Sequence, residues 1–80
     1  MIEVKVRLYG GLGKYSAGAG IGEAMVLSVP EDSRLPALLT RLGVPQEKVN
    51  LTFVNHQQQG DNYQLRDGDQ VGIFPLVAGG

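Results

Sequence analysis

Apolar and polar residues alternate near the start of the chain, and this alternation predicts the first β-strand. Apolar side chains occupy every second position over residues 2–8, with Glu3, Lys5 and Arg7 between them. Period-two alternation is the pattern of a strand that buries one face. Residues 23–29 repeat it, which predicts a second strand with Met25, Leu27 and Val29 on one face.

A helical pattern follows the second strand. Four leucines between residues 35 and 42 have the i, i+3, i+4, i+7 spacing of one helical face. Ser33 or Asp32 is the expected N-cap, and Gly43 is the expected residue just beyond the last turn. A helix of about ten residues is too short to be stable alone in water. Its leucine stripe is therefore expected to pack on a sheet.

Residues 49–54 predict a third strand. Its odd-numbered residues, Val49 to Phe53, are expected to face the helix, and its even-numbered residues, Asn50 to Val54, are expected to face away. The polar connection after it contains His56, the single histidine of the chain, which is interpreted as a solvated loop residue.

Residues 70–76 predict the last strand, whose phase decides where its aromatic residue lies. If Val71 and Ile73 face the helix, Gly72 and Phe74 lie on the opposite side of the sheet, which we call the open face. On a common register, the exposed apolar residues of the open face are then Val26, Val54 and Phe74. Such a cluster is typical of a partner surface. The alternative is a bulge near Pro75 that turns Phe74 into the core.

The remaining segments predict connections. Residues 9–22 hold six of the twelve glycines, and their spacing matches neither a P-loop nor a dinucleotide-binding fingerprint. Leu12 and Tyr15 are spaced to seat a short helical turn within this connection. Residues 63–65 are a candidate edge strand, and residues 66–69 predict a tight turn in which Gly68 supplies the positive φ.

This order of elements indicates an α+β fold. Five short strands and one helix favour a β-grasp, with four to five strands in a mixed sheet on one main helix. The first and last strands are expected to be central and parallel. We expect residues 1–75 to form the β-grasp domain and residues 76–80 to form an extended Gly-Gly tail.

Composition excludes several classes of function. Eighty residues with a net charge of −1 predict one domain without the basic face of a nucleic-acid-binding protein. No membrane span, signal peptide or metal-ligand cluster is apparent, and there is no cysteine to act as a nucleophile. Together, these features of the composition favour a cytoplasmic protein that is not an enzyme by itself and binds no cofactor.

The C-terminal residues are the one candidate for a reactive site in this sequence. Ala78, Gly79 and Gly80 have little or no side chain, so an extended tail could pass through a channel too narrow for larger residues. A partner enzyme could then activate the carboxylate of Gly80 with ATP as an acyl-adenylate. The product could be a thiocarboxylate or an amide with a lysine.

Residues 67–80, Asp-Gly-Asp-Gln-Val-Gly-Ile-Phe-Pro-Leu-Val-Ala-Gly-Gly, resemble the ending of the MoaD/ThiS family of ubiquitin-like sulfur carriers. The similarity is greatest to the small subunit of molybdopterin synthase. It extends over the chain through the Val-Pro-Glu strand end, the leucine-striped helix and the Gly-Asp turn. One difference is Pro75-Leu76 where the family has Pro-Pro.

The resemblance implies roles for the last seven residues. Gly80 would be adenylated by a ubiquitin-activating-like adenylyltransferase, which uses the ATP, and would become a thiocarboxylate. Val77, Ala78 and Gly79 would thread the partner's site, while Phe74, Pro75 and Leu76 would dock on the partner. The sulfur would pass to a pterin precursor inside the large subunit of molybdopterin synthase, for the molybdenum or tungsten cofactor.

Three alternatives share this ending. The chain could carry sulfur for thiamine or thionucleoside synthesis, or it could be a ubiquitin-like modifier conjugated to lysines. It could also be a plain β-grasp interaction domain with an incidental Gly-Gly.

Overall fold

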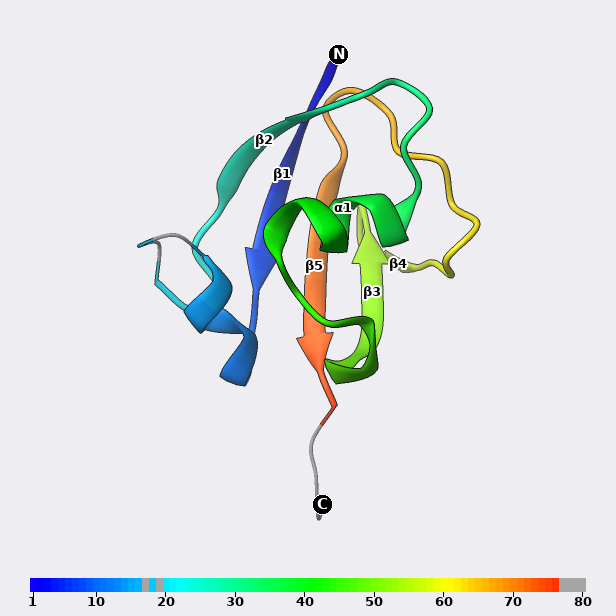
Figure 1. The fold of residues 1–80 in the computed structure, drawn as a ribbon. Helices are drawn as coiled ribbons and strands as arrows, with labels where there is room; N and C mark the ends of the chain where they lie inside the picture. The colour runs from blue at the N-terminus through cyan, green and yellow to red at the C-terminus, as the bar shows by residue number, and fades with distance from the viewer. Residues whose placement is uncertain (17, 19, 77–80) are drawn as a thin grey trace.

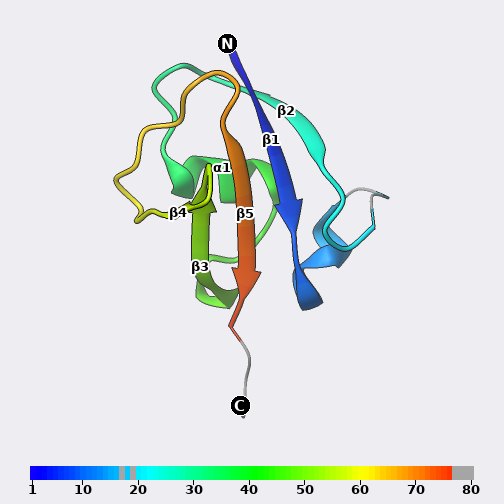
Figure 2. The same ribbon diagram turned by 180° about the vertical axis from the view of Figure 1, so that it is seen from behind.

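The computed structural model describes residues 1–16, 18 and 20–76. One five-stranded sheet has the order β2-β1-β5-β3-β4, and helix α1 lies across one of its faces (Figure 1). The elements are β1 (Ile2–Leu8), β2 (Met25–Val29), α1 (Leu35–Leu42), β3 (Val49–Val54), β4 (Gln57–Gln58) and β5 (Gln70–Pro75). β1 and β5 are parallel, and the other neighbours are antiparallel. The predicted α+β class and β-grasp arrangement are confirmed, and Figure 2 shows the open face from behind.

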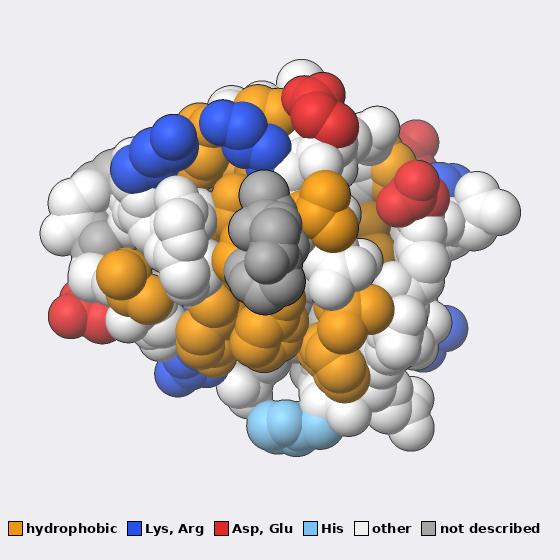
Figure 3. Space-filling view, turned by 90° about the horizontal axis from the view of Figure 1, so that it is seen from below, with side chains coloured by type: hydrophobic (Ala, Val, Ile, Leu, Met, Phe, Trp, Pro, Cys, Tyr) orange, Lys and Arg blue, Asp and Glu red, His pale blue; other side chains and the backbone are white. Residues whose placement is uncertain are grey.

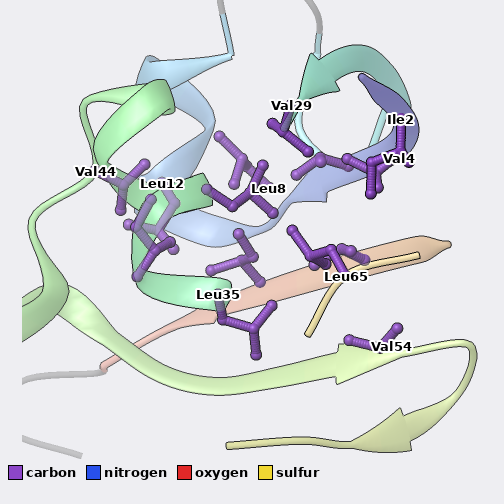
Figure 4. Packing of buried hydrophobic residues seen from close by; sticks show 14 residues of the cluster. Ile2, Val4, Leu8, Leu12, Val29, Leu35, Val44, Val54 and Leu65 are labelled. Atoms are coloured by element: carbon purple, nitrogen blue, oxygen red, sulfur yellow. The ribbon is translucent and has the colours of Figure 1, made fainter. Parts of the chain in front are cut away.

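The core lies between α1 and the sheet. Along β1, buried and more exposed side chains alternate as the sequence predicts. The packed residues come from every layer of the fold (Figure 4). The buried hydrophobic residues of the described chain are Ile2, Val4, Val6, Leu8, Leu12, Val29, Leu35, Leu38, Leu39, Val44, Val54, Leu65, Val71 and Ile73. They join the helix, β1 and β5 in one cluster, which fixes the position of β5.

Helix α1 buries its leucine stripe and ends as predicted. Leu35, Leu38 and Leu39 are buried. Gly43 has φ 77°, in the left-handed region, and its N–H bonds to the carbonyl of Leu39. Glycine adopts this conformation without the steric cost of a Cβ atom, and it therefore ends the helix.

The predicted N-cap at Ser33 or Asp32 is wrong. Arg34 occupies that position with an extended backbone and no capping side chain. The chain is still strand-like at this point, because the Ser33 carbonyl accepts a hydrogen bond from the Leu65 N–H at 2.8 Å and Arg34 forms an isolated bridge with Gln64. This pairing delays the first helical turn.

The glycine-rich connection contains an ordered turn. Residues Gly10–Tyr15 form a 3-10 helix with Leu12 buried, so the predicted helical turn at Leu12 and Tyr15 is confirmed. β2 begins at Met25, two residues later than predicted. Gly22 holds the connection to the sheet, because its N–H bonds to the Leu8 carbonyl at 2.9 Å.

The predicted phase of β3 is wrong from Leu51 onward. Its pairing with β5 shifts between Val49 and Leu51, which is the signature of a β-bulge. One extra residue moves every later side chain to the other face. Thr52 and Val54 are therefore buried, and Phe53 lies opposite Gly72 on the open face. Val54 consequently does not belong to the open-face cluster that the sequence predicted.

The edge strand is also not where the sequence placed it. β4 is formed by Gln57–Gln58, whereas residues 63–65 contribute only the bridge at Gln64 and a buried Leu65. A two-residue turn joins β3 to β4, with φ 51° at Asn55 and 71° at His56. Positive φ at both central residues defines a type I′ hairpin. His56 is exposed, as predicted, but it belongs to this tight turn.

A buried carboxylate ties this hairpin to β5. Asp69 is 5% exposed and accepts hydrogen bonds from Asn55 Nδ2, the Tyr63 hydroxyl and the Arg66 N–H, each at 2.9 Å. Asp69 closes the predicted turn, in which Gly68 has the expected positive φ, 86°. No sequence pattern predicts this network, because its members are up to 14 residues apart.

The network predicts a stability change at alkaline pH. Burial, and then the hydrogen bond and charge of Asp69, raise the pKa of Tyr63 above its ordinary 10.0. A raised pKa in the folded state means that the unfolded state loses this proton first. The stabilisation is therefore complete below pH 10 and is lost as the pH rises through the folded pKa.

We expect Tyr63→Phe to lower the free energy of unfolding by about 1.5 kcal/mol at pH 7, the lower end for a hydrogen bond to a charged group. The difference between variant and parent should shrink above pH 10. Urea unfolding of both proteins at a series of pH values measures it. A difference that is constant through the alkaline range would rule out the linkage.

Candidate functional site

Strand β5 carries Phe74 onto the open face. Val71 and Ile73 are 2% and 0% exposed against the core, whereas Phe74 is 36% exposed. The predicted phase of this strand is confirmed. The alternative, a bulge that turns Phe74 into the core, is wrong. A bulge does lie opposite Phe74 and Pro75, but its extra residue belongs to β3, and Phe74 stays exposed.

Phe74 lies in a group of three rings, which we call the aromatic cluster: Tyr9, Phe53 and Phe74. The Tyr9 and Phe74 rings are stacked, with centroids 4.5 Å apart and planes 3° apart. Phe53 meets Phe74 edge-on, with centroids 5.6 Å apart. Both are favourable aromatic geometries. Sequence reasoning missed Tyr9, which directly follows β1, and Phe53, whose phase it reversed.

Gly72 makes room for this cluster. It lies opposite Phe53, and a Cβ atom added to it would be 3.4 Å from the Tyr9 ring. Aromatic rings that cover a strand glycine protect its backbone. The result is a shallow hollow of about 340 Å³, lined by the aromatic cluster with Arg7, His56, Gln70, Val71 and Gly72. The cluster is therefore an apolar floor with basic side chains at its rim.

Arg7 is held in place at this rim. Its Nε donates a hydrogen bond to the Gly22 carbonyl at 3.1 Å, which joins β1 to the glycine-rich connection. Arg7 follows the polar face of β1, so it projects from the same side of the sheet as Lys5. A partner that covers the aromatic cluster would meet these cations at its edge.

The chain leaves the sheet at Pro75 and Leu76. The Leu76 N–H donates to the carbonyl of Lys48, the residue before β3, at 2.8 Å, so the backbone stays hydrogen-bonded to the domain one residue past β5. A Cβ atom on Gly10 would be only 2.8 Å from Pro75 Cγ, which shows how closely the glycine-rich connection packs against this exit. Leu76 itself is 58% exposed.

A second hollow of about 330 Å³ lies beside this exit, lined by Gly11, Leu12, Lys14, Glu47, Lys48, Pro75 and Leu76. Figure 3 shows this end of the molecule, where hydrophobic side chains gather around the end of β5 and Lys and Arg side chains lie to one side. The structure thus brings Phe74, Pro75 and Leu76 together at one end. Val77, Ala78, Gly79 and Gly80 lie outside the described residues.

The described part of the chain shows neither a metal site nor a membrane-spanning helix. Over residues 1–16, 18 and 20–76, no three His, Asp or Glu side chains are placed to hold a metal ion. No helix in these ranges has the length and apolar character to cross a bilayer. The two features that stand out are the aromatic cluster and the chain exit next to it.

Sequence comparison identifies a family. The family model described as the ThiS family matches residues 13–80, which include the whole ending. No curated protein matches the chain.

Solved structures share the fold. A Pyrococcus furiosus protein described as a candidate molybdopterin converting factor subunit 1 is 24% identical, with a TM-score of 0.73 over 96% of this chain and 100% of its own. Haloferax volcanii small archaeal modifier protein 1 is 17% identical, with a TM-score of 0.66 over 96% and 100%. A Caldiarchaeum subterraneum ubiquitin is 16% identical, with a TM-score of 0.64 over 99% and 98%.

Proposed function

This chain belongs to the ThiS family of ubiquitin-like sulfur carriers, and from that premise we propose that Gly80 is its reactive residue. The carboxylate of Gly80 is adenylated by a ubiquitin-activating-like enzyme and converted to a thiocarboxylate. The sulfur then serves molybdopterin synthesis, with this chain as the small subunit of molybdopterin synthase. The chain supplies the reactive group and the docking face, and the partners supply the catalysis.

One observation carries the proposal: the family match continues through Gly79 and Gly80, on a fold whose last strand ends at Pro75. From Leu76 onward, five residues separate the sheet from the reactive carboxylate. An extended chain spans about 3.3 Å per residue, so Gly80 could reach roughly 15 Å from the sheet. That is enough to enter a partner's active site while the domain stays outside.

The chemistry needs a carboxylate and no side chain of this protein. A Gly80 carboxylate oxygen attacks the α-phosphorus of ATP, and pyrophosphate leaves. Hydrosulfide then attacks the acyl carbon, and AMP leaves to give the thiocarboxylate. Alternatively, a persulfide attacks the acyl carbon as AMP leaves, and a thiol then reduces the resulting acyl disulfide to release the thiocarboxylate. The sulfur must come from another protein or a small donor, because the chain contains no cysteine. Small residues at Ala78 and Gly79 keep the tail thin enough for a narrow channel.

The aromatic cluster is the docking surface in this proposal. It is rimmed by Arg7 and His56 and lies beside the chain exit at Pro75 and Leu76. Exposed apolar surface next to a reactive tail favours a partner that covers both.

Phe74→Ala tests this docking role. We expect partner binding to weaken at least tenfold, measured by calorimetry with the activating enzyme, because a central aromatic anchor is lost (each tenfold is about 1.4 kcal/mol). The free energy of unfolding should fall by about 1–2 kcal/mol, the value of two ring contacts. A loss of about 3–5 kcal/mol, typical of buried phenylalanine, would instead make Phe74 a core residue. Ile21→Ala, at an exposed residue of the glycine-rich connection, is the control.

The molybdopterin pathway is supported by the Phe-Pro ending and by the fold shared with the Pyrococcus furiosus protein. A second function, conjugation to lysines, is supported by the equally complete fold match with the archaeal modifier and the archaeal ubiquitin. Both functions share the adenylate, and they differ in the acceptor.

Intact mass separates the two functions. The protein is incubated with ATP, a ubiquitin-activating-like enzyme and a sulfur donor. Replacement of one oxygen by sulfur is the expected mass change for the carrier. Conjugates of higher mass that disappear on deletion of Gly79 and Gly80 would favour the modifier. If neither product forms with an active enzyme, the proposal fails.

A further inference from the structure

One edge of the sheet lacks the usual protection. β2 forms this edge, and among the described residues no strand lies on its outer side (Figures 1 and 2). Its five residues, Met-Val-Leu-Ser-Val, include no charge and no proline. Native edge strands are usually very short or carry charges or proline, which prevents pairing with another chain. The opposite edge, β4, follows this rule, because it consists of two glutamines.

Hydrogen bonds in β1 show which β2 backbone groups point away from β1. The Glu3 N–H donates to Asp67 Oδ1 at 2.8 Å, and the Glu3 carbonyl accepts from the Gly68 N–H at 2.8 Å. The Lys5 N–H donates to the Asp69 carbonyl at 2.9 Å. The backbone groups of Glu3 and Lys5 therefore point toward β5 and away from β2.

This assignment fixes the outward groups of β2. Glu3 lies opposite Ser28, and Lys5 lies opposite Val26. In an antiparallel ladder, opposed residues exchange both hydrogen bonds or none, and the two kinds of pair alternate. Ser28 and Val26 are therefore in the pairs without hydrogen bonds. Each directs its N–H and its carbonyl outward, beyond the edge of the sheet.

These four groups are self-complementary. We propose that β2 pairs antiparallel with β2 of a second copy of this chain, about a two-fold axis at Leu27. Val26 of each copy then lies opposite Ser28 of the other, and each pair exchanges two hydrogen bonds. The four bonds use every outward group of Val26 and Ser28, and the result is a continuous ten-stranded sheet.

Side chains and charges favour a second copy over an unrelated strand. The two Leu27 side chains, half-buried in each copy, meet at the axis, where opposed residues approach most closely. Val26, 59% exposed, gains a neighbour on the open face. In the dimer, Lys5 and Val26 of one copy would lie in line with Ser28 and Glu3 of the other. Each such line ends in one positive and one negative side chain, so like charges are not opposed.

The dimer leaves the proposed carrier chemistry accessible. β5 is two strands in from the β2 edge, and the two-fold axis places the two β5 ends at opposite ends of the sheet. Because the contact is confined to one pair of five-residue strands, we expect it to bury less than roughly 1,200 Å², and the dimer should form only at high protein concentration.

Sedimentation velocity and amide hydrogen exchange test the proposal up to a protein concentration of about 1 mM, where weak pairs form. We expect a concentration-dependent dimer, with added protection confined to the amides of Val26 and Ser28. Ser28→Pro removes an outward N–H, a position where an edge strand tolerates proline. It should raise the dimer Kd at least about tenfold, because two intermolecular hydrogen bonds are lost. Ser28→Thr keeps the donor and should dimerise like the parent.

Charged substitutions at Leu27, the residue on the two-fold axis, give an independent test. Leu27→Lys and Leu27→Glu should each be monomeric, because like charges would meet, and their mixture should form a heterodimer. A monomer at every concentration overturns the proposal and leaves the edge to an extended segment of another protein. A dimer that Ser28→Pro does not weaken overturns it as well, since another surface must then be responsible.

Discussion

Replacing Gly79 with valine should abolish adenylation of Gly80 and leave the fold unchanged. The valine side chain would have to enter the part of the channel next to the reaction centre, which in the proposed mechanism is too narrow for it. A displacement of about 1 Å from the reactive geometry costs on the order of 10²-fold in rate. ATP–pyrophosphate exchange with the activating enzyme should therefore fall by at least about 100-fold. The residue lies beyond β5, so we expect the thermal midpoint to stay within the range of neutral surface changes.

Two controls separate a blocked tail from a damaged protein. Gly60→Val places the same side chain at an exposed glycine whose added Cβ would meet nothing within 4 Å. It should leave exchange at the parental rate. If Gly79→Val protein unfolds, the tail is part of the folded core, and the proposed division at residues 75 and 76 is wrong.

Asp69→Ala should cause a larger loss of stability than Tyr63→Phe or Phe74→Ala. The buried carboxylate accepts three hydrogen bonds, from Asn55, Tyr63 and Arg66. Its removal leaves those donors without their acceptor, at a cost of about 3 kcal/mol. For a domain of this size, the thermal midpoint should fall by about 12–24 °C.

Calorimetry of Asp69→Ala beside Asp61→Ala checks this prediction. Asp61 is exposed, so its variant should remain within about 0.5 kcal/mol of the parent. Equal midpoints for the two variants would contradict the role of the network. The network lies at the turn that begins β5, away from the chain exit. Asp69→Ala protein should therefore still be adenylated at temperatures where it is folded.

The sequence predicted correctly those parts of the fold in which apolar residues recur at a regular spacing. β1 alternates over its whole length, and the leucine stripe of α1 has helical spacing, so each shows its buried face directly. Val71 and Ile73 likewise set the phase of β5, and that phase places Phe74 on the open face. This is why the position of Phe74, the first residue of the candidate site, can be predicted from the sequence.

The predictions that failed depend on contacts between distant residues. Apolar and polar residues alternate from Val49 to Phe53, but a bulge reverses the phase of β3 from Leu51 onward and buries Thr52. β4 is two exposed glutamines, so no hydrophobic period marks it. Its type I′ turn uses Asn55 and His56, where Asn-Gly would have been the recognisable signal.

The aromatic cluster is predictable only in part for the same reason. The phase of β5 places Phe74, but alternation alone assigns Phe53 to the core, because no residue of β3 signals the bulge. Tyr9 follows the last residue of β1, where period-two reasoning no longer applies, and only the structure shows its ring stacked on Phe74. The Asp69 network joins three separate segments, which no local pattern reveals.

The most direct test of the central claim locates the sulfur. After incubation with ATP, the activating enzyme and a sulfur donor, trypsin should release the peptide that follows Arg66, and tandem mass spectrometry should fragment it. We predict that one oxygen is replaced by sulfur and that only fragments containing Gly80 carry the change. Sulfur on any other residue, or an unmodified peptide from a reaction in which a known carrier is modified, would contradict the assignment of Gly80 as the reactive residue.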